Sequence, residues 1–215
     1  MAATPTAIED YVKVIYSHTE WQPSKITGSV LAARLGLAAS SVTEMVKKLV
    51  AQGLVIHEPY GAVELTAAGN ALALRMIRRH RLIETWLVER YGYSWDEVHD
   101  EAEVLEHSLS DRLLDAIDAE LGHPTRDPHG DLIPRLDGSI VRPAAARLAD
   151  VDAGVVVRIS DSDPLLLRRL EAEGIALDAH VRVVEREALG ATVTIGEVAI
   201  RLTDEALASI WVKLS

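Results

Sequence analysis

The chain has 215 residues, of which 48% are hydrophobic, and it carries a formal net charge of −11 at pH 7. This length allows one large or two small domains, and the hydrophobic content excludes a disordered chain. The acidity argues against general affinity for nucleic acid, although not against a small DNA-reading face, and the absence of cysteine excludes disulfides, thiolate metal sites and cysteine nucleophiles.

The N-terminus predicts an amphipathic helix over residues 5–19, because its apolar residues recur at helical spacing. Asp10 lies in the first turn, where a carboxylate also suits the helix dipole. This segment lacks the basic and apolar pattern of a signal peptide, and no apolar run approaches the roughly 18 residues of a transmembrane helix. We therefore expect a cytoplasmic protein that makes no membrane contact.

Residues 27–55 predict two helices joined by a tight turn at Gly36. The first helix covers residues 29–35, and the second runs from about 39–41 to Gln52. The second helix has a buried stripe made of Val42, Met45, Val46, Leu49 and Val50. Its polar face carries Ser40, Ser41, Thr43, Glu44, Lys47 and Lys48. This pattern is typical of a helix-turn-helix whose second helix enters the DNA major groove.

The next segment, VIHEPYGAVELT, predicts a β-hairpin with a Pro-Tyr-Gly turn, which is the wing of a winged-helix domain. A helical hairpin of some unrelated domain is the alternative. From Thr66 a long helix is expected to run to about Tyr91, with Thr66 as its N-cap. Its apolar residues exceed what one small domain can cover, and this predicts a homodimer.

The stretch from His80 to His107 concentrates histidines and carboxylates at helical spacing. His80 and Glu84 are four apart, as are His99 and Glu103. If residues 94–107 form one helix, Glu103, Glu106 and His107 converge on one patch and could supply three metal ligands. One such pair is more often solvated surface. Two pairs on consecutive helices, with further histidine and carboxylate positions in line, leave the surface interpretation and the metal site about equal on spacing alone.

The remaining chain changes character twice. Residues 111–121 predict a further helix, and residues 122–138 predict a structured loop that contains Asp127 and His129. After Pro143, five short β-rich runs and one short helix, PLLLRRLEAEG, indicate a small β-barrel without a catalytic pattern.

With these residues in view, the chain resembles the diphtheria-toxin-repressor family of metal-dependent transcription regulators. The strings MIRRHRLIETWL, VHDEAEVLEHSLSD and PHGDLIPRLD carry the resemblance, which covers essentially the whole chain. It implies a mainly α fold with small β regions. A winged-helix DNA-binding domain would occupy residues 1–66, a helical metal-binding and dimerisation domain residues 67–142, and an SH3-like β-barrel residues 143–215.

The resemblance also implies two metal sites per chain. The primary site would take the positions of Asp10, His80, Glu103, Glu106 and His107. In the iron-responsive branch the position of Asp10 is Met and that of Glu103 is Cys, so this chain looks like the manganese-responsive branch. Lys13 stands where one short manganese-responsive form has a Glu, and the compact binuclear site of that form is therefore not expected.

The second site would use the equivalents of Glu84, His99, Asp127, His129 and an acidic residue of the SH3-like domain. Asp163 fits best in spacing, and Asp161 is a close rival. His99 serves this site in the iron branch and need not do so here, and His129 could instead be an ordinary turn histidine.

The resemblance implies a transcriptional repressor, not an enzyme. It would bind pseudo-palindromic operator DNA as a homodimer when Mn²⁺, or alternatively Fe²⁺, occupies its metal sites. In this way it would control metal homeostasis. An iron-responsive regulator of the same family is the alternative. Two rivals from other classes are a metallohydrolase and a metal-storage protein without DNA binding. Both leave the helix-turn-helix pattern without a role.

Overall fold

The computed structural model describes residues 6–21, 24–58 and 61–214. The described chain divides into two compact units, one formed by residues 1–80 and 134–139 and the other by residues 81–133 and 140–215. The division falls inside helix α4 (Ala67–Tyr91), between His80 and Arg81. The sequence predicts three domains, with boundaries at 66/67 and 142/143. The two compact units do not test these boundaries, which stay a prediction.

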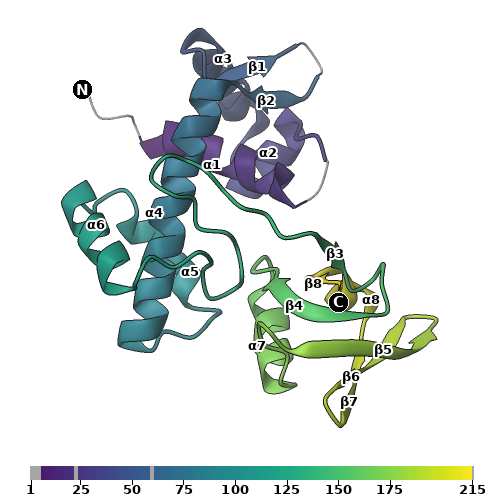
Figure 1. The fold of residues 1–215 in the computed structure, drawn as a ribbon. Coiled ribbons are helices and arrows are strands. Elements are labelled where there is room, and N and C mark those ends of the chain that lie inside the picture. The colour runs from purple at the N-terminus through teal and green to yellow at the C-terminus, as the bar shows by residue number, and fades with distance from the viewer. Residues whose placement is uncertain (1–5, 22–23, 59–60, 215) are drawn as a thin grey trace. The chain divides into compact units, whose positions relative to one another are not determined.

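The first unit contains α1 (Thr6–Glu20), α2 (Gly28–Leu35), α3 (Ala39–Ala51), the hairpin β1 (Val55–His57) and β2 (Val63–Leu65), and the first part of α4. Figure 1 shows the three helices and the hairpin around this part of α4. The helices pack through buried apolar side chains that include Ile8, Val12, Leu31, Val46 and Leu49. The strands pair antiparallel, with Ile56 opposite Glu64. These elements confirm the predicted winged helix-turn-helix order.

Local sequence explains the turn between α2 and α3. Thr27 caps α2 by accepting a hydrogen bond from the Val30 backbone N–H, and Gly36 ends it at φ 64°, a left-handed conformation that suits glycine. One detail of the predicted stripe is wrong: Val50 is 42% exposed, because it lies at the edge of the buried face of α3. The predicted Pro-Tyr-Gly turn of the wing falls partly on residues 59 and 60, outside the described residues.

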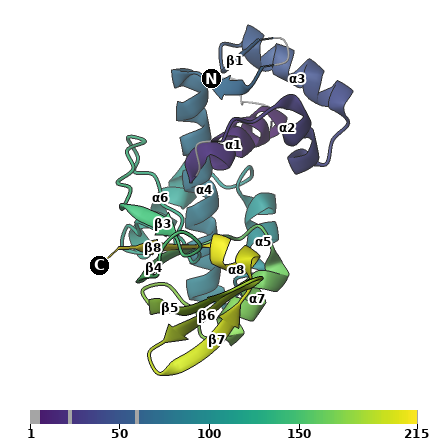
Figure 2. The same cartoon turned by 90° about the vertical axis from the view of Figure 1, so that its right-hand side faces the viewer.

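The helical part of the second unit joins the end of α4 to α5 (Val98–Leu105) and α6 (Asp111–Glu120). Leu82, Ile83, Val98, Ala102 and Leu114 form its buried core, and Figure 2 shows α5 and α6 beside this end of α4. The helix considered over residues 94–107 covers only Val98–Leu105, because residues 95–97 and 106–108 form turns at its two ends. At the first of these turns the Ser94 carbonyl accepts hydrogen bonds from residues 97 and 98.

The C-terminal part is an antiparallel six-stranded sheet in the order β3-β8-β4-β5-β6-β7. The strands are β3 (Ala145–Arg147), β4 (Ala153–Ile159), β5 (His180–Glu187), β6 (Gly190–Ile195), β7 (Val198–Leu202) and β8 (Ile210–Lys213), and the helices are α7 (Pro164–Ala172) and α8 (Asp204–Ala208). The five expected strands and the expected helix are present. Strand β3 and helix α8 were not predicted from the sequence, because both are too short to show a period in their apolar residues.

No single helix of the described residues is long and apolar enough to span a bilayer. The pair α2 and α3, bent by 113° at its turn, has the combined length and composition.

Candidate metal centre

Five possible metal ligands of the second unit gather from four segments of the chain. Glu84 comes from α4, His99 from α5, Asp127 and His129 from the loop after α6, and Asp161 from the loop after β4. Ligand atoms lie within 4.8 Å of one another in two groups, Glu84 with His99 and Asp161, and Glu84 with Asp127 and His129. Glu84 is therefore shared by both groups. We call these five residues the inner cluster.

The orientation of His129 is fixed by its surroundings. Its ring is fully buried, and its Nε2 lies 2.9 Å from the backbone carbonyl oxygen of Trp95. A carbonyl can only accept, so in the neutral ring Nε2 carries the proton and Nδ1 keeps its lone pair. Within the described part of the chain, Nδ1 has no hydrogen-bond partner. A buried imidazole that donates one N–H to a backbone carbonyl and leaves its other nitrogen open is arranged as histidine metal ligands are.

Asp127 is held by its own loop. Its Oδ1 accepts hydrogen bonds from the backbone N–H groups of His129 and Asp131, both at 2.9 Å. Its Oδ2 lies 3.6 Å from Nε of Arg81. The N–H of Gly130 also bonds to the carbonyl of Asp127. Because one carboxylate oxygen is used by the turn, the other remains for a cation.

The electrostatics of the inner cluster favour a cation. Burial, with the carboxylates of Asp131 and Glu84, raises the pKa of Asp127 well above its ordinary value. Burial by itself lowers the pKa of His129, but the carboxylates of Asp127, Glu84 and Asp161 outweigh it and raise that pKa. Both shifts report an excess of negative charge in a place with little water.

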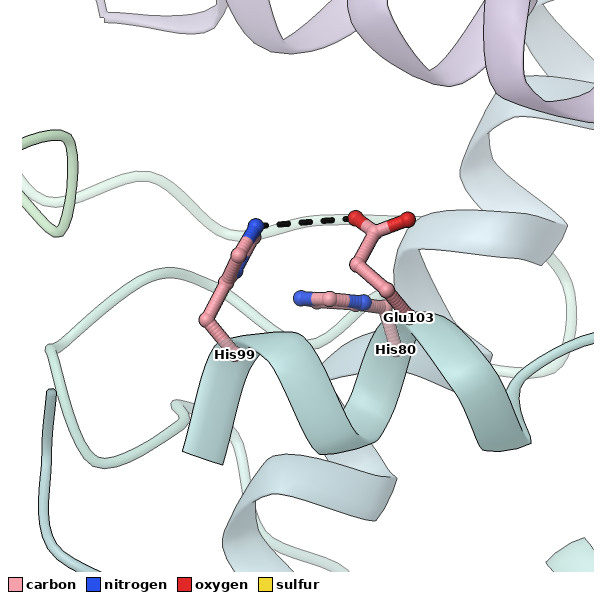
Figure 3. A group of neighbouring side chains, drawn as sticks. All are labelled: His80, His99 and Glu103. Atoms are coloured by element: carbon pink, nitrogen blue, oxygen red, sulfur yellow. Dashed lines mark ion pairs between the residues drawn. The ribbon is translucent and has the colours of Figure 1, made fainter. Parts of the chain in front are cut away.

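His99 lies at the more exposed side of the inner cluster, with 44% of its side chain accessible. Its Nδ1 is 3.3 Å from Glu84 and 3.8 Å from Asp161, and its Nε2 is 3.6 Å from Glu103. Figure 3 shows the pair of His99 and Glu103 one turn apart on α5. The third residue drawn there, His80, belongs to α4 and is the last residue of the first unit. His99 therefore contacts three carboxylates.

The two acidic candidates of the C-terminal part have different surroundings. Asp161 joins Glu84 and His99, as described above. The preferred candidate, Asp163, is instead the N-cap of α7, where its Oδ1 accepts hydrogen bonds from the N–H groups of Leu165 and Leu166. Spacing alone did not distinguish Asp161 from Asp163, because the two are only two residues apart. Pro164 occupies the first position of α7, and this makes Asp163 the N-cap and leaves Asp161 in the loop.

The other predicted ligands are divided between the units. Asp10 on α1 and His80 on α4 belong to the first unit, and Glu103, Glu106 and His107 belong to the second. Within the second unit, Glu106 is fully buried and its Oε1 lies 3.3 Å from Nε2 of His107. Glu106 follows the last residue of α5, and its N–H still bonds to the carbonyl of Ala102.

The predicted DNA-reading residues all lie on the exposed face of α3. Glu44 and Lys47 form an ion pair of 2.8 Å there, with both side chains more than two-thirds exposed. Thr43 donates its hydroxyl to the carbonyl of Ala39. The exposed face is therefore available to a partner.

Sequence reasoning missed a shell of residues around the inner cluster. Asp131 accepts a hydrogen bond from Nε of Arg158 at 2.6 Å and lies 3.5 Å from Arg81. Arg158 in turn stacks on Trp211, 4.3 Å from the ring centroid. Trp95 supplies the carbonyl for His129 and packs against the core of the C-terminal sheet. A single Arg or Trp inside an apolar run gives no signal at the level of sequence.

Three family models together match most of the chain. Residues 4–63 match the family described as "Iron dependent repressor, N-terminal DNA binding domain". Residues 66–135 match "Iron dependent repressor, metal binding and dimerisation domain", and residues 146–214 match "FeoA domain". The iron-dependent repressor IdeR of Mycobacterium tuberculosis is 32% identical in an alignment of 202 positions, which covers 87% of each chain. The chain belongs to the diphtheria-toxin-repressor family.

Solved structures of the family agree over almost the full length. A manganese-dependent transcriptional repressor in complex with manganese is 48% identical, with a TM-score of 0.93 over 97% of this chain and 100% of that one. The manganese regulator SloR is 32% identical, with a TM-score of 0.79 over 97% and 98%. The chain is therefore a metal-dependent DNA-binding repressor with a dimerisation domain, and not an enzyme.

Proposed function

We propose that this repressor responds to Mn²⁺ and that the inner cluster is its second metal site. The observation that carries the proposal is the buried Nδ1 of His129, which has no hydrogen-bond partner within the described residues and belongs to a group with two carboxylates. Oxygen ligands with one or two imidazoles and no sulfur suit Mn²⁺ and also accept Fe²⁺. The 48% identical manganese-dependent repressor supports the same choice.

Charge balance supports one ion in the inner cluster. With neutral histidines, its carboxylates are those of Glu84, Asp127 and Asp161, and the neighbouring Asp131 adds a fourth. Arg81 and Arg158 supply two positive charges beside them. Two negative charges remain, and one divalent cation neutralises them. We therefore infer one ion here, with His99 as an additional ligand or as a neighbour that orients Glu84 and Asp161.

The primary site in this proposal uses the five ligands predicted from the family resemblance. They are Asp10, His80, Glu103, Glu106 and His107. Glu106 and His107 are already in contact within the second unit, which supports their joint use. Asp10 is the contribution of the DNA-binding domain, so occupation of this site would link that domain to the rest of the chain.

The proposed switch follows from the charges of these side chains. Three carboxylates brought together repel one another by roughly 4 kcal/mol for each pair about 4 Å apart at an effective dielectric of 20. A divalent cation supplies the opposite charge. Without the cation, this repulsion disfavours an arrangement with Asp10 near Glu103 and Glu106, so the DNA-binding domain would not be held in one arrangement. Metal binding and DNA binding are then thermodynamically linked.

The DNA-bound form in this proposal is a homodimer on a pseudo-palindromic operator, through which the protein controls metal homeostasis in the cytoplasm. Ser40, Ser41, Thr43 and Glu44 would face base edges, and Lys47 and Lys48 would face phosphates. The exposed side chains of α3 support this assignment. Sedimentation of the purified chain with Mn²⁺ at micromolar concentration should give a dimer, and a monomer alone would contradict it.

The deciding experiment is a DNA-binding titration on the promoter of the protein's own gene. We expect Mn²⁺ to tighten binding by about 5- to 150-fold relative to a chelator-treated sample. The same titration with Fe²⁺ under anaerobic conditions distinguishes the two effectors. Equal binding with and without either metal would exclude a metal-dependent switch, and a response to Fe²⁺ alone would assign the chain to iron.

A further inference from the structure

The turn that carries Asp127 and His129 is fastened to strand β4 of the C-terminal sheet. The N–H of Ile159 bonds to the carbonyl of His129 at 2.8 Å. On the same turn, Asp131 accepts the hydrogen bond of the buried Arg158 side chain. These two contacts join residues 129 and 131 to neighbouring residues of β4. The turn is therefore attached through both its backbone and a charged side chain.

Gly130 stands between these two contacts and makes them possible. A Cβ at this position would lie 2.1 Å from the carbonyl oxygen of Val157 and 2.8 Å from Cα of Arg158. Both are backbone atoms of β4, so the strand cannot simply move a side chain aside. Gly130 also has φ +91°, which other residues rarely adopt. Only glycine allows the turn to lie this close to the strand.

The same strand leads directly to a further ligand. β4 ends at Ile159, and Asp161 follows two residues later. Three members of the inner cluster thus depend on one strand: Asp161 by continuation of the chain, and Asp127 and His129 by the fastened turn. Glu84 and His99 come instead from helices.

We propose that strand β4 is the base of the second metal site and that Gly130 and Arg158 are positioning residues for Asp127 and His129. Gly130 sets the distance of the turn from the strand. Arg158 acts through Asp131, whose backbone N–H holds the carboxylate of Asp127. The C-terminal domain therefore contributes to this site not only the ligand Asp161 but also strand β4 and Arg158, which contact no ion. This inference rests on the assignment of the inner cluster as a metal site.

The test is a Mn²⁺ titration of the full-length chain, in which electron paramagnetic resonance measures the free ion. Gly130→Ala should weaken the second ion by 10- to 100-fold, the range typical when a group that supports a metal ligand is lost. The affinity of the first ion should stay within about twofold. Wild-type affinity for the second ion in this variant would overturn the proposal.

A matched control separates positioning from backbone strain. Gly174 ends its helical segment at φ +82°, close to the angle of Gly130, and a Cβ there would meet no atom of the described residues within 4 Å. Gly174→Ala should lower the unfolding midpoint in chelator but leave both Mn²⁺ affinities unchanged. Equal loss of the second ion in both variants would show that strain alone is responsible and would contradict the proposal.

A second variant covers the case in which Gly130→Ala does not fold. Arg158→Met combined with Asp131→Asn removes both charges of the buried pair, and Arg81 keeps Asp127 as its anionic partner. It should also weaken the second ion by at least tenfold, and an unchanged affinity would overturn the role of Arg158. His129→Ala in the same titration identifies the source of a failure. If it removes no ion, the inner cluster is not a metal site, and both proposals fall. If it removes one while the other variants do not, only the positioning role is wrong.

Discussion

The inner cluster and the proposed primary site use similar side chains but are built differently. The inner cluster lies within one compact unit, and its Asp127 and His129 are held by backbone hydrogen bonds and by Arg81. The ligands of the primary site are divided between the two units. A site whose ligands are already assembled can bind an ion with little rearrangement, whereas a site divided between units can convert binding into a change of arrangement. The first suits a structural role and the second suits a switch.

The largest expected effect that tests this comparison is the loss of an ion from the inner cluster. His129→Ala should reduce the number of bound Mn²⁺ ions from two to one per chain and leave metal-dependent DNA binding in place. At free Mn²⁺ about 100-fold above the dissociation constant, a lost ion costs about 2.7 kcal/mol of metal-induced stability. Calorimetric unfolding with and without Mn²⁺ measures this, with His180→Ala on the exposed start of β5 as the control.

Asp10→Ala tests the other half of the comparison. The variant should still fold, dimerise and bind metal, because four primary ligands remain. It should lose the coupling of about 1–3 kcal/mol between metal and DNA. Glu9→Ala removes the neighbouring first-turn carboxylate and serves as the control. Full metal-dependent DNA binding by Asp10→Ala, measured by fluorescence anisotropy, would return Asp10 to an ordinary role at the helix start.

Stability of the metal-free protein and Mn²⁺ binding to the inner cluster should both depend on pH. The raised pKa values of Asp127 and His129 mean that the metal-free folded protein holds these protons more tightly than the unfolded chain does. Its stability therefore falls as pH rises above 3.8 for Asp127 and above 6.5 for His129, through their folded values. Mn²⁺ must displace the same protons, so its apparent affinity should rise by about tenfold per pH unit for each proton released. A titration between pH 5 and pH 8 checks this, and a flat profile would contradict it.

The smallest effect separates the two acidic candidates of the C-terminal domain. Asp163→Ala should cost about 0.5–2 kcal/mol of stability, because the N-cap of α7 is lost, with Mn²⁺ affinity unchanged. Asp161→Ala should weaken the second ion instead. Chemical denaturation and a Mn²⁺ titration on both variants distinguish cap from ligand. The reverse result would make Asp163 the ligand, as its spacing first indicated.

The fold was predictable from sequence wherever a period was long enough to read. The helix-turn-helix, the hairpin, helix α4 and five strands all follow from apolar spacing and turn residues. Strand β3 and helix α8 were missed, because three and five residues carry no period. The turn at residues 95–97 was not indicated by the sequence, since these residues include neither glycine nor proline.

The candidate site was predictable in its residue types but not in its support. Spacing and resemblance indicated Glu84, Asp127 and His129, which the structure brings together. They could not indicate that His129 donates to Trp95, or that Gly130 must lack a side chain. Such contacts join segments far apart in the chain, and sequence spacing contains no information on them.

The ion pair of Glu44 and Lys47 on α3 has a consequence for how the protein searches DNA. In the absence of DNA, Lys47 already has an anionic partner at 2.8 Å. In the proposed DNA complex, a phosphate that binds Lys47 would leave Glu44 beside the negatively charged backbone, where it is repelled unless a base amino group donates a hydrogen bond to its carboxylate. Lys47 would therefore add little affinity for random DNA and more affinity for the correct operator. In the proposed DNA complex, this ion pair would lower the affinity of α3 for random DNA and so shorten the residence of the protein on the many competing sites of a genome.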